Sequence, residues 1–375
     1  MMENQPIVVL GLGPAGLFLV RQLSNLTKNI YALGRPDDVG MYSKYVTKDK
    51  RYYATDSSGI GTALEHIVLR EGRKAILHVS SDQYLSILIE DPACWMEYAD
   101  LSGSGIDTLT LINDKNSISE YCRAHGVKMP QSISYEDYMR GNHEFPVIIK
   151  WVEKRIETAV NPIGKVKVCR SEEELSQVNT AIVDGDIDFS ELFVQTYIEG
   201  KNDCQFSVGG YFKDGVSLAD ITVNQIKQYP QGISAMVVSV DGGEVEELRD
   251  ITYHFARGLK YTGFLEMEYK IDALTGEPYL LDVNPRPWGW ISILGTVYPD
   301  LYEVLRGNKP SWEKQNAVWQ SPIRAFFSKK NPQNVGMPAG IGAYRKAYDI
   351  KDKADCMPSF MIYGMAFKKI VRRIK

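Results

Sequence analysis

The stretch Gly263–Pro287, GFLEMEYKIDALTGEPYLLDVNPRP, organises the rest of the chain. Alternating residues predict a first strand at Leu265–Tyr269, and a second run predicts another strand at Tyr279–Asn284. Thr275 and Gly276 lie between the two runs and are typical of a turn. We therefore expect a β-hairpin here.

A hairpin centred on Thr275 places Glu268 opposite Asp282. It also places Glu266 opposite Asn284. Because side chains two residues apart on a strand share a face, all four oxygen-bearing groups are expected on one side. Facing carboxylates repel each other, and Mg²⁺ removes the repulsion because it prefers oxygen ligands and phosphate oxygens. The pattern favours a metal site, and a solvated acidic strand face is the alternative interpretation.

Composition limits the class of protein. At 375 residues the chain suggests two or three domains, and 44% apolar and 24% charged residues are typical of a globular protein. A net charge of −4 argues against nucleic-acid binding. Five scattered cysteines indicate a reducing compartment, and no apolar run reaches the roughly 18 residues of a membrane span. With no signal-peptide pattern at the N-terminus, we expect a cytoplasmic protein.

A glycine-rich turn opens the chain. A buried strand precedes GLGPAG at residues 11–16, which matches GxGxxG, and an apolar helix follows from Leu17 to Leu26. This pattern also fits a flavin- or nicotinamide-dependent oxidoreductase. Such a site normally has an acidic residue after the second strand, but here Asn29–Leu33 is followed by Gly34, Arg35 and Pro36. We therefore favour a structural role, in which the glycines permit a tight turn and close helix packing.

The acidic hairpin also resembles a known family. Glu-Met-Glu-Tyr, followed by Leu-Leu-Asp-Val-Asn-Pro-Arg-Pro-Trp, is similar to the metal-binding end of the ATP-grasp superfamily. It most resembles the carboxylate–amine ligase branch that includes D-aspartate ligases. In that family the second strand reads Glu-x-Asn-x-Arg, and Asp282 stands here in place of that Glu. The resemblance implies ATP with Mg²⁺, or Mn²⁺ in its place, and it implies Glu268, Asp282 and Asn284 as metal ligands.

The resemblance extends over residues 5–308 and implies an α/β architecture. A Rossmann-like pre-ATP-grasp domain is expected at residues 1–112. An ATP-grasp domain of two α+β subdomains is expected at residues 113–308, followed by a C-terminal extension at residues 309–375.

Further residues are matched to the nucleotide. Lys150 ends an apolar strand, where a cation requires a partner such as a phosphate. By position in the family, Gln195 and the backbone of Tyr197 and Ile198 would bind adenine, and Asp203 the ribose. The complete set expected to contact the nucleotide is Lys115, Lys150, Lys165, Gln195, Tyr197, Ile198, Asp203 and Lys227. The segment at 153–163 lacks the glycines of the family's phosphate cover.

These features imply an enzyme that activates a carboxylate as an acyl phosphate and passes it to an amine. Lys150 and Arg286 would be catalytic, because they would stabilise the transferring phosphoryl group. The substrates would be a small-molecule or precursor-linked carboxylate and amine. Two alternatives stay open: the oxidoreductase suggested by the glycine turn, and an ATP-binding regulator without activity.

The chain ends in a basic amphipathic pattern. Apolar residues recur at helical spacing from Tyr363 to Ile374, and Lys368, Lys369, Arg372 and Arg373 occupy the other side. One interpretation is a terminal helix packed on the body. The other is peripheral contact with an anionic membrane surface.

Overall fold

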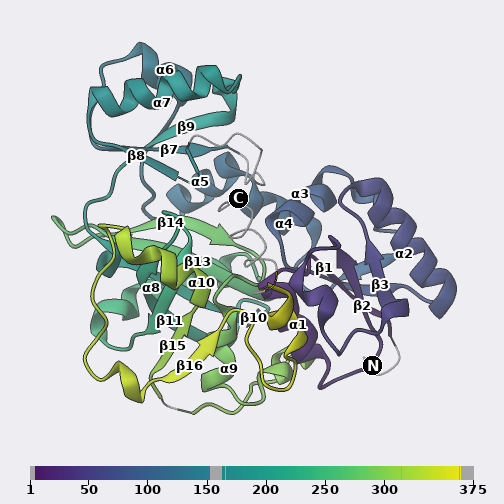
Figure 1. The fold of residues 1–375 in the computed structure, drawn as a ribbon. Coiled ribbons are helices and arrows are strands. Elements are labelled where there is room, and N and C mark those ends of the chain that lie inside the picture. The colour runs from purple at the N-terminus through teal and green to yellow at the C-terminus, as the bar shows by residue number, and fades with distance from the viewer. Residues whose placement is uncertain (1–4, 153–162, 165, 314, 363, 365–375) are drawn as a thin grey trace.

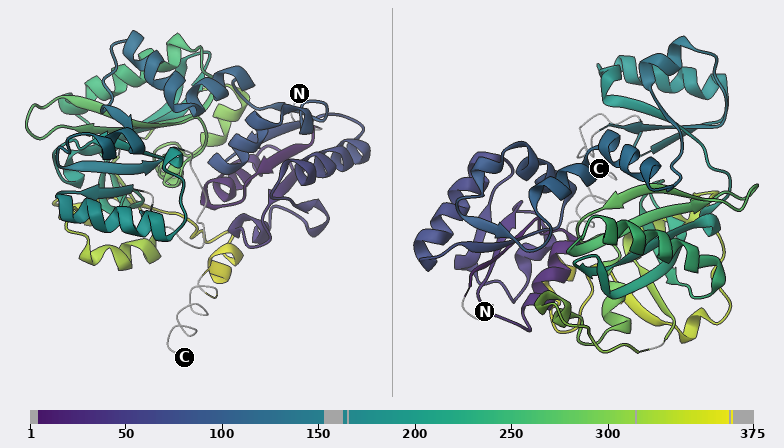
Figure 2. Two further views of the ribbon diagram at one scale, coloured as in Figure 1. Left: turned by 90° about the horizontal axis from the view of Figure 1, so that it is seen from above. Right: turned by 180° about the vertical axis from the view of Figure 1, so that it is seen from behind.

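Three β-sheets make up the protein. In a computed structural model, the structure describes residues 5–152, 163–164, 166–313, 315–362 and 364 (Figure 1). Within these residues the sheets have five, four and seven strands. Figure 2 shows the five-stranded sheet beside the seven-stranded sheet, with the four-stranded sheet standing apart from both.

The N-terminal sheet is parallel, in the order β3-β2-β1-β4-β5. Its strands are β1 (Ile7–Leu10), β2 (Ile30–Gly34), β3 (Arg51–Tyr53), β4 (Ala75–Val79) and β5 (Ala99–Leu101). The helices that follow or separate them are α1 (Pro14–Leu23), α2 (Ser57–Glu71), α3 (Asp82–Glu90) and α4 (Ile106–Asn113). Every residue of β1 and β2 is buried, as expected of central parallel strands. The predicted Rossmann-like domain is confirmed.

The glycine-rich turn between β1 and α1 packs against its own chain. Gly11 has a φ of +86°, and a Cβ on Gly16 would lie 2.0 Å from the Gly11 carbonyl oxygen. The Leu12 N–H donates to Asp38 Oδ2 at 3.1 Å, and the Gly40 N–H donates to the Leu12 carbonyl at 2.8 Å. This geometry supports the structural interpretation of the glycines.

The four-stranded antiparallel sheet has the order β6-β9-β7-β8. Its strands are β6 (Ser132–Ser134), β7 (Val147–Trp151), β8 (Val166–Cys169) and β9 (Leu192–Thr196). Helices α6 (Tyr135–Arg140) and α7 (Glu172–Asp184) cover one face, and α5 (Lys115–Ala124) precedes the sheet (Figure 1). Ile149 from the sheet and Leu175 from α7 belong to the core that joins them.

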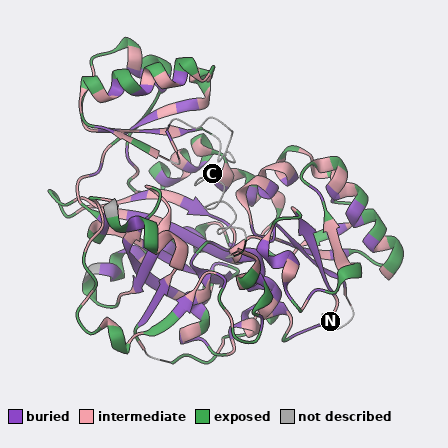
Figure 3. Ribbon diagram, viewed as in Figure 1, coloured by how far each residue is buried: buried purple, intermediate pink, exposed green. Residues whose placement is uncertain are grey.

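The seven-stranded sheet has the order β14-β13-β10-β11-β12-β15-β16, and Figure 3 shows buried residues along its central strands. Its strands are β10 (Gln205–Lys213), β11 (Val216–Gln228), β12 (Ser234–Ser239), β13 (Gly263–Ile271), β14 (Pro278–Asn284), β15 (Ala317–Gln320) and β16 (Arg345–Tyr348). Helix α8 (Gly243–Gly258) covers one face. The β15–β16 pair is parallel and the other pairs are antiparallel.

Residues expected as a C-terminal extension belong to this sheet. β15 pairs with β12, and β16 pairs with β15. The pairing covers an edge that β12 would otherwise expose. The chain from residue 309 therefore completes the seven-stranded sheet, and α10 (Pro322–Phe327) packs beside it.

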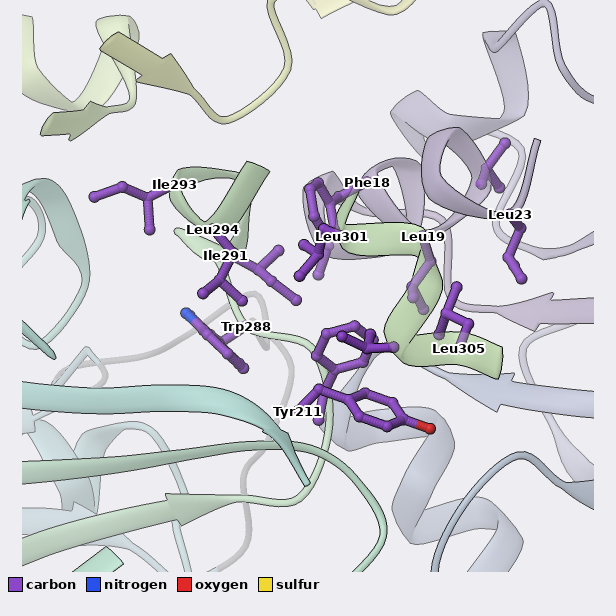
Figure 4. Packing of buried hydrophobic residues seen from close by; sticks show 14 of the residues in the cluster. Phe18, Leu19, Leu23, Tyr211, Trp288, Ile291, Ile293, Leu294, Leu301 and Leu305 are labelled. Atoms are coloured by element: carbon purple, nitrogen blue, oxygen red, sulfur yellow. The ribbon is translucent and has the colours of Figure 1, made fainter. Parts of the chain in front are cut away.

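The apolar run after Trp290 does not form one continuous helix. It forms two 3₁₀ turns, Ile291–Ile293 and Leu301–Arg306, with the short α9 (Leu294–Val297) between them. Pro299 lies at the break, where proline removes a backbone donor. As Figure 4 shows, this segment packs against Phe18 of α1, so the N-terminal domain and the large sheet share one core.

A buried carboxylate anchors the C-terminal segment to the N-terminal domain. Asp355, 1% exposed, accepts hydrogen bonds from Arg21 Nε at 3.1 Å, Ser43 Oγ at 2.8 Å and the Lys44 N–H at 3.0 Å. The basic half of the predicted C-terminal helix, at 363 and 365–375, lies outside the described residues. Among the described helices, none is long and apolar enough to cross a membrane.

We expect Asp355→Asn to destabilise the protein by about 3 kcal/mol, because it breaks a buried ion pair and leaves Arg21 without its charged partner. Thermal and urea unfolding would measure the loss. Asp37→Asn is the control, since Asp37 pairs with Arg35 at an exposed position where the pair contributes about 0–1 kcal/mol. Equal stability of the two variants would contradict the anchoring role.

Candidate active site

A cavity of about 2220 Å³ lies between the four-stranded and seven-stranded sheets, with α3 of the N-terminal domain at its rim. This volume exceeds the roughly 300–1,000 Å³ of most ligand sites, so it has room for a nucleotide and a second substrate. The hairpin β13–β14 forms part of its floor.

The hairpin has the predicted register. Glu268 pairs with Asp282, and Glu266 pairs with Asn284. The register shifts by one residue beyond Glu268, towards the turn, where Gly276 has a φ of +75°. All four side chains line the cavity, so the predicted metal ligands do lie together.

Neutral donors separate the carboxylates of the hairpin. Asn284 Nδ2 donates to Glu266 Oε2 at 3.1 Å and lies 3.4 Å from Glu268 Oε1. Trp290 Nε1 donates to Glu266 Oε1 at 2.7 Å, and Glu266 is only 2% exposed. Both carboxylate oxygens of Glu266 are thus hydrogen-bonded by protein donors. Glu268 and Asp282, in contrast, are half-buried at the cavity surface.

Arg286 is bound by the N-terminal domain. Its Nε donates to Asp82 Oδ1 at 2.7 Å, and its Nη2 donates to Asp82 Oδ2 and, at 3.0 Å, to Asn284 Oδ1. Burial by itself would lower the pKa of Arg286, but Asp82 and then Glu266 and Asp282 raise it. The guanidinium is therefore fixed as a cation beside the hairpin.

Two lysines approach the cavity from the four-stranded subdomain. Lys150 Nζ donates to Gln195 Oε1 at 2.7 Å. Lys115 Nζ donates to the Trp151 carbonyl at 2.6 Å and lies 4.3 Å from the centre of the Phe193 ring. Both lysines line the cavity, so the predicted phosphate contacts lie across from the acidic hairpin.

The predicted adenine contacts also line the cavity. Gln195 is on β9, and its Nε2 donates to Ser132 Oγ at 3.2 Å. Tyr197 and Ile198 follow directly after the strand ends at Thr196. The main chain leaves the strand ladder at this point. It must do so if its N–H and C=O groups are to hydrogen-bond the edge of an adenine base.

Two predicted nucleotide contacts are placed elsewhere. Of the described residues that line the cavity, none is Asp203 or Lys227. Asp203 is exposed on a 3₁₀ turn, and Lys227 is paired with Met236 after a register shift in β11. Met236 packs in a separate apolar cluster. Lys165 lies outside the described residues.

Other residues at the cavity carried no sequence signal for a site. Asp82 reads as a helix-capping residue, yet it binds an arginine 204 positions away. Arg324 comes from a segment that no motif covers. The further side chains of this group are Trp290 and Trp319, whereas Trp288, which also lines the cavity, ends the motif quoted for the resemblance.

Solved structures share this fold. An N5-carboxyaminoimidazole synthetase from Staphylococcus aureus, complexed with ADP, matches with a TM-score of 0.62 and 14% identity, over 85% of this chain and 82% of its own. An L-amino acid ligase from Bacillus licheniformis matches with a TM-score of 0.60 and 12% identity, over 85% and 80%. Pyruvate carboxylase from Rhizobium etli matches with a TM-score of 0.60 and 15% identity, over 84% of this chain but 31% of its own.

These similar structures are ATP-grasp enzymes, so the predicted ATP-grasp fold is confirmed. At identities of 12 to 15% the likeness establishes the fold. No protein-family model and no curated protein matches the sequence.

A double-mutant cycle would test the link between the N-terminal domain and the hairpin. We expect Asp82→Asn and Arg286→Gln to show a coupling free energy of about 1–3 kcal/mol in urea unfolding, because the pair is bidentate and largely buried. The same cycle on Arg35 and Asp37, which are exposed, should give a value near zero. Additive effects at Asp82 and Arg286 would show that the two domains are not coupled here.

Proposed function

We propose that this protein is an ATP-dependent ligase that joins a carboxylate to an amine through an acyl phosphate. The observation that carries the proposal is one cavity with two opposed walls. The paired oxygens of Glu268 and Asp282 form one, and the cations Lys115 and Lys150 lie on the other. A phosphate chain bridging metal and lysines satisfies both charges.

The hairpin offers a donor set that fits Mg²⁺. Glu268 and Asp282 supply carboxylate oxygens, and Asn284 supplies an amide oxygen with a second lone pair beyond its bond to Arg286. In the described ranges, no three His, Cys, Asp or Glu side chains form a group that could hold a metal ion. The set is therefore suited to an ion that takes its other ligands from nucleotide phosphates. Bound Mg²⁺ would neutralise charge on those phosphates.

The chain's own groups position the reaction. Lys150, released from Gln195, and Lys115 bind phosphate oxygens, and Arg286 stabilises the transferring phosphoryl group. A substrate carboxylate oxygen attacks the γ-phosphorus, and ADP leaves. An amine then attacks the acyl carbon, phosphate leaves and an amide forms. No nucleophilic side chain is required, because the substrate supplies the attacking oxygen.

The oxidoreductase interpretation has less support. The Leu12 N–H of the glycine turn is already bound by Asp38, and the turn is absent from the described residues that line the large cavity. A regulator that binds ATP without turning it over is the remaining alternative. Screening carboxylate–amine pairs for ADP release, with mass analysis of the product, tests between them. A product lighter than the combined substrates by one water supports the ligase, and no ADP from any pair favours the regulator.

We expect Glu268→Gln and Asp282→Asn each to reduce Mg²⁺-dependent ADP release by at least about 100-fold. Losing one carboxylate from a small ligand set costs several kcal/mol of transition-state stabilisation. The matched control is Glu277→Gln on the same hairpin, where Glu277 pairs with Lys128 and is half-exposed. Near-normal turnover in the first two variants, with unchanged circular dichroism, would remove the hairpin from the chemistry.

Mg-ATP, rather than NAD or FAD, should raise the melting temperature. A ligand that binds the native state adds about 2.7 kcal/mol of stability at a hundredfold excess over its dissociation constant. Differential scanning fluorimetry would measure the shift, and Lys150→Met should reduce it, because Lys150 lines the cavity. A shift with NAD or FAD, and none with Mg-ATP, would overturn the nucleotide assignment.

A further inference from the structure

Two indole groups at the large cavity lack the hydrogen bonds that the other buried indoles make. Trp95, Trp151 and Trp290 each donate to a protein oxygen. Trp288 and Trp319 line the cavity and are at most 1% exposed, yet among the described residues neither Nε1 has a partner. An unmet buried donor is costly, and an indole N–H can only donate. A ligand that satisfies it must therefore present an oxygen acceptor.

A cation lies near Trp319, whose partner on β12 is Val237, three residues from Ser234. Arg324, on α10, lines the cavity, and its Nη1 lies 3.4 Å from the Ser234 carbonyl on β12. Ser234 Oγ donates to Gln225 Oε1, and Gln225 Nε2 donates to Ser207 Oγ. Among the described residues, Asp349 is an acidic neighbour of Arg324, and burial raises its pKa although Ser321 and Arg324 act to lower it.

The floor of the cavity therefore changes in charge from one end to the other. Glu268 and Asp282 lie on β13 and β14, whereas Ser234 lies on β12 and Trp319 on β15. Strands β10 and β11 separate β13 from β12, which is roughly 14 Å at about 4.8 Å a strand. An acidic group held at Arg324 is too far from the hairpin to attack a phosphate bound there.

Trp288 lies beside the hairpin, at the level of Glu266. It lies on Gly209 of β10, where a Cβ would come within 2.3 Å of its Cζ2 atom. Glycine at 209 thus lets the indole rest directly on the sheet. The indole that lies toward Arg324 is therefore Trp319, which pairs with Val237 three residues along β12 from Ser234.

We propose that Trp319 and Arg324 form a subsite for a second acidic group, so that the carboxylate substrate is an elongated molecule with an anionic oxygen group remote from its reacting end. The inference rests on the proposed function only for the position of that reacting end. The second group is a carboxylate or a phosphate, since both accept hydrogen bonds from an indole and a guanidinium.

Nuclear magnetic resonance of indole-¹⁵N-labelled full-length protein tests the subsite without turnover. Trp288→Phe and Trp319→Phe assign the two resonances. α,ω-Dicarboxylates of increasing chain length are then added, with and without Mg²⁺ and a non-hydrolysable ATP analogue. Monocarboxylates and α-carboxylate-ω-phosphates of matched length separate the two anionic sources. We expect the Trp319 indole proton to move downfield with the doubly anionic probes and far less with monocarboxylates.

Arg324→Gln should weaken binding of the doubly anionic probes at least about tenfold, which is the loss expected for a hydrogen bond to a charged group. Arg324→Lys should restore part of it, and Trp312, which is 61% exposed, is the unaffected reference resonance. No Trp319 shift with any probe, or unchanged affinity in Arg324→Gln, would overturn the subsite. If the nucleotide analogue binds but the probes give no Trp319 shift, the subsite fails and the ligase proposal stands. If the probes bind but the nucleotide analogue does not, the ligase proposal fails and the subsite stands.

Discussion

Electrostatic repulsion between Glu268 and Asp282, which face each other across one strand pair, is the constraint on which the rest of the structure depends. Two carboxylates on a half-buried sheet face require nearby positive charge or donors. The protein supplies some of it through Asn284 and the Arg286 guanidinium, while the Trp290 indole satisfies the neighbouring Glu266. Asn284 ends the second strand, and Arg286 and Trp290 follow it within six residues. A metal ion bound together with phosphate would supply the rest of the charge that compensates the two carboxylates.

The N-terminal domain supports this arrangement from outside the ATP-grasp fold. Asp82, the first residue of α3, fixes the guanidinium of Arg286 through two hydrogen bonds. Helix α1 also packs its apolar side chains into the core beneath Trp288 (Figure 4). The glycine turn that resembles a dinucleotide site therefore serves packing, and through packing it steadies the hairpin.

The sequence predicted what depends on local pattern. The hairpin register follows from residue alternation and one turn, and it needs no distant contact, which is why the pairing of Glu268 with Asp282 matches. The pair between Asp82 and Arg286 spans 204 positions, so no local signal announces it. Position matching also places Lys227 at the nucleotide, whereas Lys227 is not among the described residues that line the cavity and register shifts flank it in β11. Short strands such as β15 carry too few residues to show a period.

The C-terminal segment connects the cavity floor to the N-terminal domain. It begins as β15, which carries Trp319 beside β12, and it is fastened by Asp355 to Arg21. A segment paired at one end and ion-paired at the other has little freedom to move as a lid. The charge that Arg324 adds to the cavity is therefore preorganised, because its helix α10 lies between these two fixed points. Leaving a buried donor of this site unpaired is costly, which would favour substrates that supply an acceptor.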